Sequence, residues 1–156
     1  MCGMRSDLPI RFLCDQNLGK IAKWLRILGF DAEYMSHWDE DLVRRSVENG
    51  RIVLTRKHAI AAHKSVVFIA HDHVSEQLQE LFGALDLRQG AGPFTRCSLC
   101  NTVLVDTNRE DVKTHIPEYV YTTQEIFARC PSCRRIYWKG THAKRIYDMI
   151  HSLLKD

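Results

Sequence analysis

The first half of the chain alternates between short apolar runs and segments with helical spacing. Runs of apolar residues, several rich in β-branched side chains, predict strands at residues 10–14, 51–55 and 66–70, and we also predict a strand at residues 31–34. Apolar residues three and four positions apart predict helices over 18–28, 39–50 and 78–85, with a short helix over 56–63. Strands that alternate with helices in this way are typical of βαβ units. The pattern therefore predicts an α/β fold built on a parallel sheet flanked by helices.

The pattern breaks at residues 87–93, whose sequence LRQGAGP contains two glycines and a proline. Such a segment favours a turn or linker over a helix or strand, so we place a domain boundary there. The prediction is a first domain over residues 8–87 and a second module over 94–156. Apolar residues recur at helical spacing from Ile146 to Leu154, which predicts a closing C-terminal helix.

Composition narrows the class of protein. The chain has 156 residues, of which 45% are hydrophobic, and this is enough to form a sizeable core. Its longest apolar runs, such as residues 66–70, are far shorter than the ~20 residues that cross a bilayer. Charged residues interrupt residues 1–13, so we predict no signal peptide and no membrane partner. We therefore expect a cytoplasmic protein, whose thiols stay reduced.

Four of the six cysteines form two Cys-x-x-Cys pairs, Cys97 with Cys100 and Cys130 with Cys133, separated by 29 residues. Each such turn aims two thiolates at one point, so two turns supply the four tetrahedral ligands that a structural zinc ion requires. The alternatives are disulfides, which a reducing compartment disfavours, and a thioredoxin-like redox pair, which needs only one such motif. We predict one structural zinc ion.

Four acidic residues follow the predicted strands or begin the next helix: Asp15, Asp39, Asp41 and Asp72. In an open parallel sheet, ligands bind beyond the carboxyl ends of the strands, where these residues are expected to meet. Carboxylates gathered at one edge bind Mg²⁺ or Mn²⁺, which activate water and neutralise charge on a phosphate. This arrangement points to a metal-dependent nuclease.

Each acid also has a purely structural interpretation. Asp39, Asp41 and Asp72 fit helix caps or favourable charges at helix N-termini. The neighbouring His71 and His73 would ligate a transition metal if both faced inward, but they also fit an ordinary loop. Asp15 has the least structural reason to stand where it does, directly after a buried strand.

A basic segment supports a nucleic-acid partner. Residues 129–147 contain six Lys or Arg residues and no Asp or Glu, and Tyr137 and Trp138 lie among them. Cationic groups neutralise phosphates, and aromatic faces stack on unpaired bases. The alternative is that both aromatic residues pack the second module against the sheet. The candidate RNA contacts lie here and on the first helix: Lys20, Lys23, Arg26, Arg134, Arg135, Trp138 and Lys144.

Several segments together resemble a known family. The carrying segments are FLCD at 12–15, LGK at 18–20, AKWLRILGFD at 22–31, GRIVLTR at 50–56, EQL at 76–78, FTRC at 94–97, CN at 100–101, CPSC at 130–133 and YWKGTH at 137–142. They are similar to the PIN-like RNase domain with an appended zinc ribbon that ends Mut-seven-type exonucleases and also occurs alone in prokaryotes. The likeness runs from about residue 11 to residue 147.

The resemblance implies a PIN-like sheet, RNA as substrate, and divalent-metal catalysis by Asp15 and an acid of the cluster 39–41. The chain departs from the family pattern in one place. Where the family has Leu-Thr-Arg-Asp, this sequence has Leu54-Thr55-Arg56 followed by Lys57. An ammonium within ~4–6 Å of the acids disfavours a bound cation. We therefore expect Lys57 to form ion pairs with Asp15 or Asp72 and to impair catalysis.

Two functions follow from the sequence. The first is a ribonuclease that depends on Mg²⁺ or Mn²⁺, with a structural zinc ion. The second is a non-catalytic RNA-binding or interaction module that keeps the PIN-like fold. A toxin-like RNase with an antitoxin partner is a weaker third interpretation.

Overall fold

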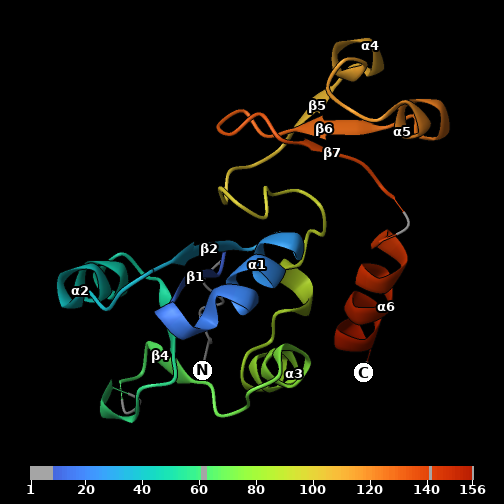
Figure 1. Ribbon diagram of the computed structural model, residues 1–156. Coiled ribbons are helices and arrows are strands. Elements are labelled where there is room, and N and C mark those ends of the chain that lie inside the picture. The colour runs from blue at the N-terminus through green and yellow to red at the C-terminus, as the bar shows by residue number, and fades with distance from the viewer. Residues whose placement is uncertain (1–8, 61–62, 141, 156) are drawn as a thin grey trace, which may run out of the picture.

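The computed structural model describes residues 9–60, 63–140 and 142–155. Its centre is a four-stranded parallel sheet with the strand order β2-β1-β3-β4 (Figure 1). The strands are β1 (Arg11–Cys14), β2 (Asp31–Tyr34), β3 (Ile52–Thr55) and β4 (Val66–Phe68). The α/β class and the four predicted strands are confirmed.

Strand register brings the carboxyl ends of the inner strands together. Cys14, the last residue of β1, lies opposite Tyr34 of β2 and Leu54 of β3. The Asp15 N–H then donates to the Leu54 carbonyl at 3.0 Å, which extends the pairing by one residue. Residues that follow these strands are therefore neighbours at the carboxyl ends of the strands. We call this end of the sheet the rim.

Helices cover both faces of the sheet. On one face, α1 (Gly19–Ile27), α3 (Val74–Ala84) and α6 (His142–Leu154) pack with the strands in the main core. The buried side chains there include Phe12, Ile21, Leu54, Leu81 and Ile150. On the other face, α2 (Glu40–Glu48) covers a smaller core. Truncating one such Leu or Ile to Ala would destabilise the fold by about 2–5 kcal/mol.

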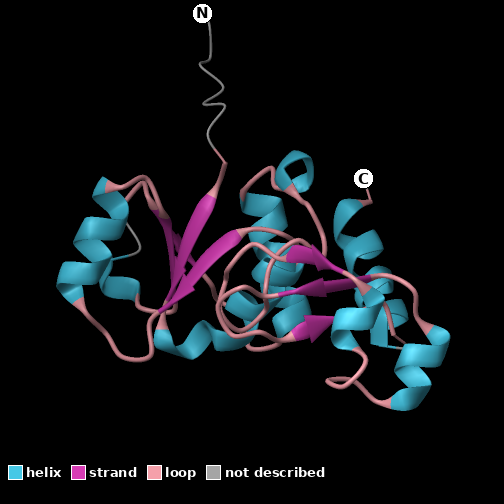
Figure 2. Cartoon of the chain, turned by 90° about the horizontal axis from the view of Figure 1, so that it is seen from above, coloured by secondary structure: helices cyan, strands magenta, loops and turns pink. Residues whose placement is uncertain are grey.

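The second module contains a three-stranded antiparallel sheet, ordered β5-β6-β7, which Figure 2 shows apart from the parallel sheet. It consists of β5 (Val105–Thr107), β6 (Phe127–Arg129) and β7 (Ile136–Tyr137). The helices α4 (Arg109–Val112) and α5 (Glu118–Thr123) lie between β5 and β6 and share a small core with β6. The sequence pattern does not predict these elements, because segments of two to six residues hold too few positions to show a period.

The link between the modules depends on Gly29. Gly29 ends the α1 segment with a φ of 93°, a left-handed conformation that favours glycine. A Cβ atom at this position would collide with the Gly92 carbonyl. The Gly92 and Phe94 N–H groups then donate to the carbonyls of Leu28 and Ile27, at 2.8 Å each. The predicted linker is thus fastened to the end of α1.

Two further segments differ from the expectation or add to it. The short helix predicted over 56–63 is a single 3-10 turn at His58–Ile60, and residues 61 and 62 lie outside the described residues. The C-terminal helix exists, but its Ile150 and Leu153 belong to the core of the parallel sheet. Across the described residues, no helix has the length and apolar character needed to cross a membrane.

Candidate functional site

The four paired cysteines converge on one point. Their sulfur atoms all lie within 4.8 Å of one another, and the Sγ atoms of Cys97 and Cys133 are 3.7 Å apart. Four thiolates at ~2.3 Å from a tetrahedral zinc ion would lie about 3.8 Å from one another. The cysteines at 97, 100, 130 and 133 therefore form a site that fits zinc and leaves no open coordination position.

Both Cys-x-x-Cys turns have the same local geometry. In each, the second cysteine N–H points at the first sulfur, at 3.3 Å from Cys100 to Cys97 and 3.4 Å from Cys133 to Cys130. A residue with left-handed φ follows each turn: Asn101 at 65° and Arg134 at 63°. In each turn, this bond fixes the first sulfur atom relative to the backbone of the second cysteine.

Tyr137 supports the same site. Its hydroxyl lies 3.0 Å from Cys97 Sγ and accepts a hydrogen bond from the Ser98 N–H at 3.2 Å. Burial opposes ionisation of Cys97, but the hydrogen bonds from Tyr137 and from the Cys100 N–H outweigh it and lower the pKa of the thiol to about 6. The hydroxyl of Tyr137 therefore supports the cysteine site, a role that differs from both base stacking and packing against the parallel sheet.

The first turn of the zinc site is also bound to the parallel sheet. Asn101 donates to Asp31 Oδ1 at 2.7 Å and accepts from the Ala32 N–H at 3.0 Å. From α1, Arg26 donates to the carbonyls of Ser98 and Leu99 at 3.2 and 3.0 Å. The turn therefore covers β2, which lies at one edge of the parallel sheet. The zinc module and the sheet are coupled through these polar contacts.

Asp15 lies at the rim and is fully buried. Its Oδ2 accepts a hydrogen bond from the Thr55 hydroxyl at 2.9 Å, and its Oδ1 accepts from the Gln16 N–H at 2.6 Å. The Thr55 hydroxyl in turn accepts from the Lys57 N–H at 3.0 Å. Among the described residues, no cationic side chain forms an ion pair with Asp15. Within the described residues, Asp15 is therefore held by neutral hydrogen-bond donors alone.

A hollow of ≈ 560 Å³ opens at the rim, and Gln16, Lys20, Tyr34, Arg56 and Asp72 are among the residues that line it. Asp15 precedes Gln16 in the chain but does not itself line the hollow. We call it the rim pocket. Arg56 and Asp72 form an ion pair at 2.7 Å. The hydrogen bond and the charge of Arg56 hold the pKa of Asp72 below its ordinary value. The rim pocket thus combines cationic side chains with one carboxylate.

The two acids that follow β2, Asp39 and Asp41, do not line the rim pocket. Asp39 caps α2, accepting from the Leu42 N–H at 3.0 Å. Asp41 is exposed and pairs with Arg44 at 3.3 Å on the same helix. Both interactions match the structural interpretation that the sequence left open.

Lys57 does not occupy the acid site. Its ammonium lies 4.0 Å from the centre of the Trp38 ring, a cation–π contact. The predicted ion pair with Asp15 or Asp72 was wrong within the described residues, because the backbone bond to Thr55 fixes the turn and Arg56 pairs with Asp72. The cysteine group is the one described set of three or more His, Cys, Asp or Glu residues close enough to share a metal ion.

Comparison with known proteins decides the family. The family model for the Mut7-C RNAse domain matches residues 10–150, which is most of the chain. The chain belongs to the Mut7-C RNAse domain family. No curated protein and no solved structure matches it. Family membership assigns a ribonuclease-type function, implies RNA as substrate or partner, and agrees with the resemblance drawn from the sequence motifs.

The candidate RNA contacts of this Mut7-C RNAse domain fall into two groups. Arg26 is engaged in docking the zinc module, since it also donates to the Ala32 carbonyl at 2.8 Å. The other six are exposed, and Lys20 among them lines the rim pocket. They are Lys20, Lys23, Arg134, Arg135, Trp138 and Lys144. Their exposure leaves them accessible to RNA.

Two residues of the rim were not predicted as site residues. Thr55 and Arg56 were read only as parts of a strand and of a motif, although one bonds to Asp15 and the other to Asp72. Their position directly at the end of β3 was the available signal. His71 bonds to Glu80 at 2.8 Å, which raises the pKa of the imidazole. His71 is therefore bound to Glu80 of α3, and among the described residues it belongs to no group that could share a metal ion.

Proposed function

We propose that this Mut7-C RNAse domain is a divalent-metal-dependent ribonuclease that cleaves RNA at the rim. The observation that carries the proposal is Asp15, a fully buried carboxylate directly after β1, whose neighbour Gln16 lines the rim pocket together with Lys20 and Arg56. Burying a charge is unfavourable unless hydrogen bonds or a counter-ion compensate it. Here two hydrogen bonds compensate it and an acquired cation would complete the compensation.

The rim pocket supplies contacts for a phosphodiester. Lys20 is exposed, and Arg56 lies at the same hollow. Arg56 has two described partners, the Asp72 carboxylate and, at 3.4 Å, the Ala70 carbonyl. A guanidinium held in this way presents its remaining N–H groups in a fixed orientation, which suits phosphate oxygens. We infer that Lys20 and Arg56 bind the RNA backbone on either side of the cleaved bond.

Asp15 and Asp72 are the residues that would hold the catalytic ion. Mg²⁺ is commonly bound by one or two carboxylates together with substrate phosphates, so two acids meet its requirement when RNA is present. When bound, such an ion lowers the pKa of water and neutralises charge on the phosphate. Thr55 is the positioning residue, because its hydroxyl fixes the orientation of the Asp15 carboxylate.

A matched pair of variants tests the proposal. Asp15→Asn keeps the size of the side chain and removes its charge, and we expect it to abolish Mn²⁺-dependent cleavage of a labelled single-stranded RNA. Asp106→Asn makes the same change on exposed β5 and should leave cleavage intact. Equal cleavage by both variants would show that Asp15 has no part in the reaction.

The second candidate function is a non-catalytic RNA-binding module. It is favoured by the departure at Lys57 and by the ion pair that already engages Asp72. This function predicts that the zinc-loaded protein binds RNA and leaves it intact at every Mg²⁺ or Mn²⁺ concentration. Both functions are consistent with a cytoplasmic location, where reduced cysteines are available to zinc.

A further inference from the structure

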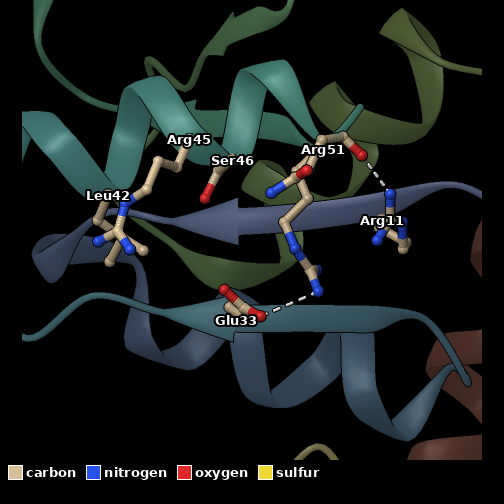
Figure 3. A pocket seen from close by; sticks show the side chains of 7 residues that line it. Arg11, Glu33, Leu42, Arg45, Ser46 and Arg51 are labelled. Carbon is tan, nitrogen blue, oxygen red and sulfur yellow. Dashed lines mark hydrogen bonds and ion pairs between the residues drawn. The ribbon is translucent and has the colours of Figure 1, made fainter.

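A second hollow lies away from the rim, between α2 and the parallel sheet (Figure 3). It has a volume of ≈ 290 Å³, and its lining includes Arg11, Glu33, Arg45, Ser46 and Arg51. We call it the α2 pocket. It shares no lining residue with the rim pocket, and Arg11 stands at the amino end of β1, opposite the rim. It is therefore a separate feature of the molecule.

Arg51 forms a fixed wall of the α2 pocket. Its side chain is 10% exposed and pairs with Asp31 at 2.9 Å and with Glu33 at 2.9 Å. It also donates to the Phe12 carbonyl at 3.1 Å. Asp31 is held in turn by Asn101 of the zinc module. These bonds neutralise the charge of Arg51 and hold its side chain fixed in the wall of the pocket.

The other two arginines have no such carboxylate. In the described part of the chain, Arg11 donates to the Asn49 carbonyl, and Arg45 donates to the Asp41 carbonyl at 3.3 Å. Neither guanidinium forms an ion pair with a described Asp or Glu. Figure 3 shows Arg45 and Arg11 toward opposite ends of the pocket, with Glu33 between them. Positive charge therefore remains at both ends.

Arg44 on the same helix shows the contrast. It is exposed and pairs with Asp41 at 3.3 Å and with Glu48 at 3.6 Å. The arginine on the outer surface of α2 is thus neutralised by its own helix, while the arginine that lines the pocket is not. Arg11, Arg45 and Arg51 against Asp31 and Glu33 leave one net positive charge at the pocket, which favours an anionic ligand.

We propose that the α2 pocket binds a segment of single-stranded RNA, with backbone phosphates on Arg11 and Arg45 and a ribose 2′-hydroxyl on Glu33. Arginine forks are suited to phosphate oxygens, and the 2′-hydroxyl is a donor that a carboxylate accepts. The inference deepens the proposed function, since it extends the contact with RNA beyond the rim. The ion pair with Arg51 keeps the Glu33 carboxylate oriented toward the bound RNA.

The test measures binding of single-stranded RNA to zinc-loaded protein without added Mg²⁺ or Mn²⁺. We expect the double variant Arg11→Ala/Arg45→Ala to bind about tenfold or more weakly, and its salt slope should fall by about one for each phosphate that is no longer neutralised. Arg44→Ala removes the same charge from the same helix and should leave both quantities near those of the wild type. Equal binding by the double variant and by Arg44→Ala would overturn the proposal.

Glu33→Gln tests the contact to ribose. This variant should reduce the preference for RNA over DNA of the same sequence, because an amide accepts a hydrogen bond from the 2′-hydroxyl less strongly than a carboxylate does. NMR signals of the Arg11 and Arg45 side chains should shift with an RNA oligomer and shift less with a mononucleotide. Shifts of equal size would assign the pocket to a free nucleotide and overturn the RNA contact.

Lys20→Ala at the rim separates this inference from the proposed function. If Lys20→Ala weakens RNA binding and the double variant does not, the α2 pocket proposal fails and the rim proposal stands. If the double variant weakens binding and the wild type cleaves no RNA with Mn²⁺, the α2 pocket stands and the ribonuclease proposal fails. Circular dichroism of each variant confirms that the change in binding is not a loss of fold.

Discussion

Replacing Asn101 tests whether the zinc module stabilises the parallel sheet. Asn101→Gly keeps a residue that tolerates the φ of 65° and removes two hydrogen bonds, one to the Asp31 carboxylate and one from the Ala32 N–H. A hydrogen bond to a charged group contributes about 1.5–3 kcal/mol and a neutral one about 0.5–1.5 kcal/mol. We therefore expect the free energy of unfolding to fall by roughly 2–4 kcal/mol. The free energy of unfolding of Asn101→Ala should be lower still, because the Cβ of alanine disfavours the left-handed conformation by about 1–2 kcal/mol.

The assay is equilibrium urea unfolding of zinc-loaded protein, followed by circular dichroism of the helices. Asn108→Ala is the control, because Asn108 makes no side-chain capping bond to α4, and its change should stay within about 0.5 kcal/mol. If Asn101→Gly unfolds at the same urea concentration as the wild type, the zinc module does not support the sheet and the reasoning from these two bonds is refuted.

Three further predictions concern zinc, acid and the rim. Metal analysis should find about one zinc ion per chain in the wild type and none in Cys130→Ser; retention of zinc by the variant would refute four-thiolate coordination. Burial raises the pKa of Asp31, but the bonds from Arg51 and Asn101 outweigh it and hold the pKa below 3.8. Its contribution to stability is thus present above about pH 4 and lost as pH falls through the lowered pKa, so Asp31→Asn should flatten the acid end of the stability–pH curve. Lys57→Asp restores the acid that the family pattern has at this position, so it should tighten Mn²⁺ binding and raise RNA cleavage. Lys57→Gln removes only the ammonium, which lies on Trp38, and should change neither; calorimetry and an RNA cleavage assay measure both.

The parallel sheet was predictable because its inner strands β1 and β3 are buried on both faces. Leu13 and Val53 on one face and Phe12 and Leu54 on the other are all apolar, so these two strands read as continuous apolar runs. The zinc ligands were predictable because the two Cys-x-x-Cys turns fix sulfur positions locally. In both cases the signal lies within a few consecutive residues.

The remainder of the site depends on contacts between distant residues. Asp15 meets Thr55 across 40 positions, and Arg56 meets Asp72 across 16. No periodicity records such pairs, so the sequence marked the acids and left Thr55 and Arg56 unassigned. Lys57 shows the same limit, since its partner Trp38 follows from the course of the chain after β3 and not from the charge of the neighbouring acids.

The most direct test of the ribonuclease proposal is a cleavage time course with purified zinc-loaded protein and single-stranded RNA, in which Mn²⁺ or Mg²⁺ is the one component varied. We predict that RNA is cleaved when either ion is added and is intact without it, while the zinc content stays constant. RNA that remains intact at every Mn²⁺ and Mg²⁺ concentration, although bound by the protein, would contradict the proposal and support the RNA-binding module instead.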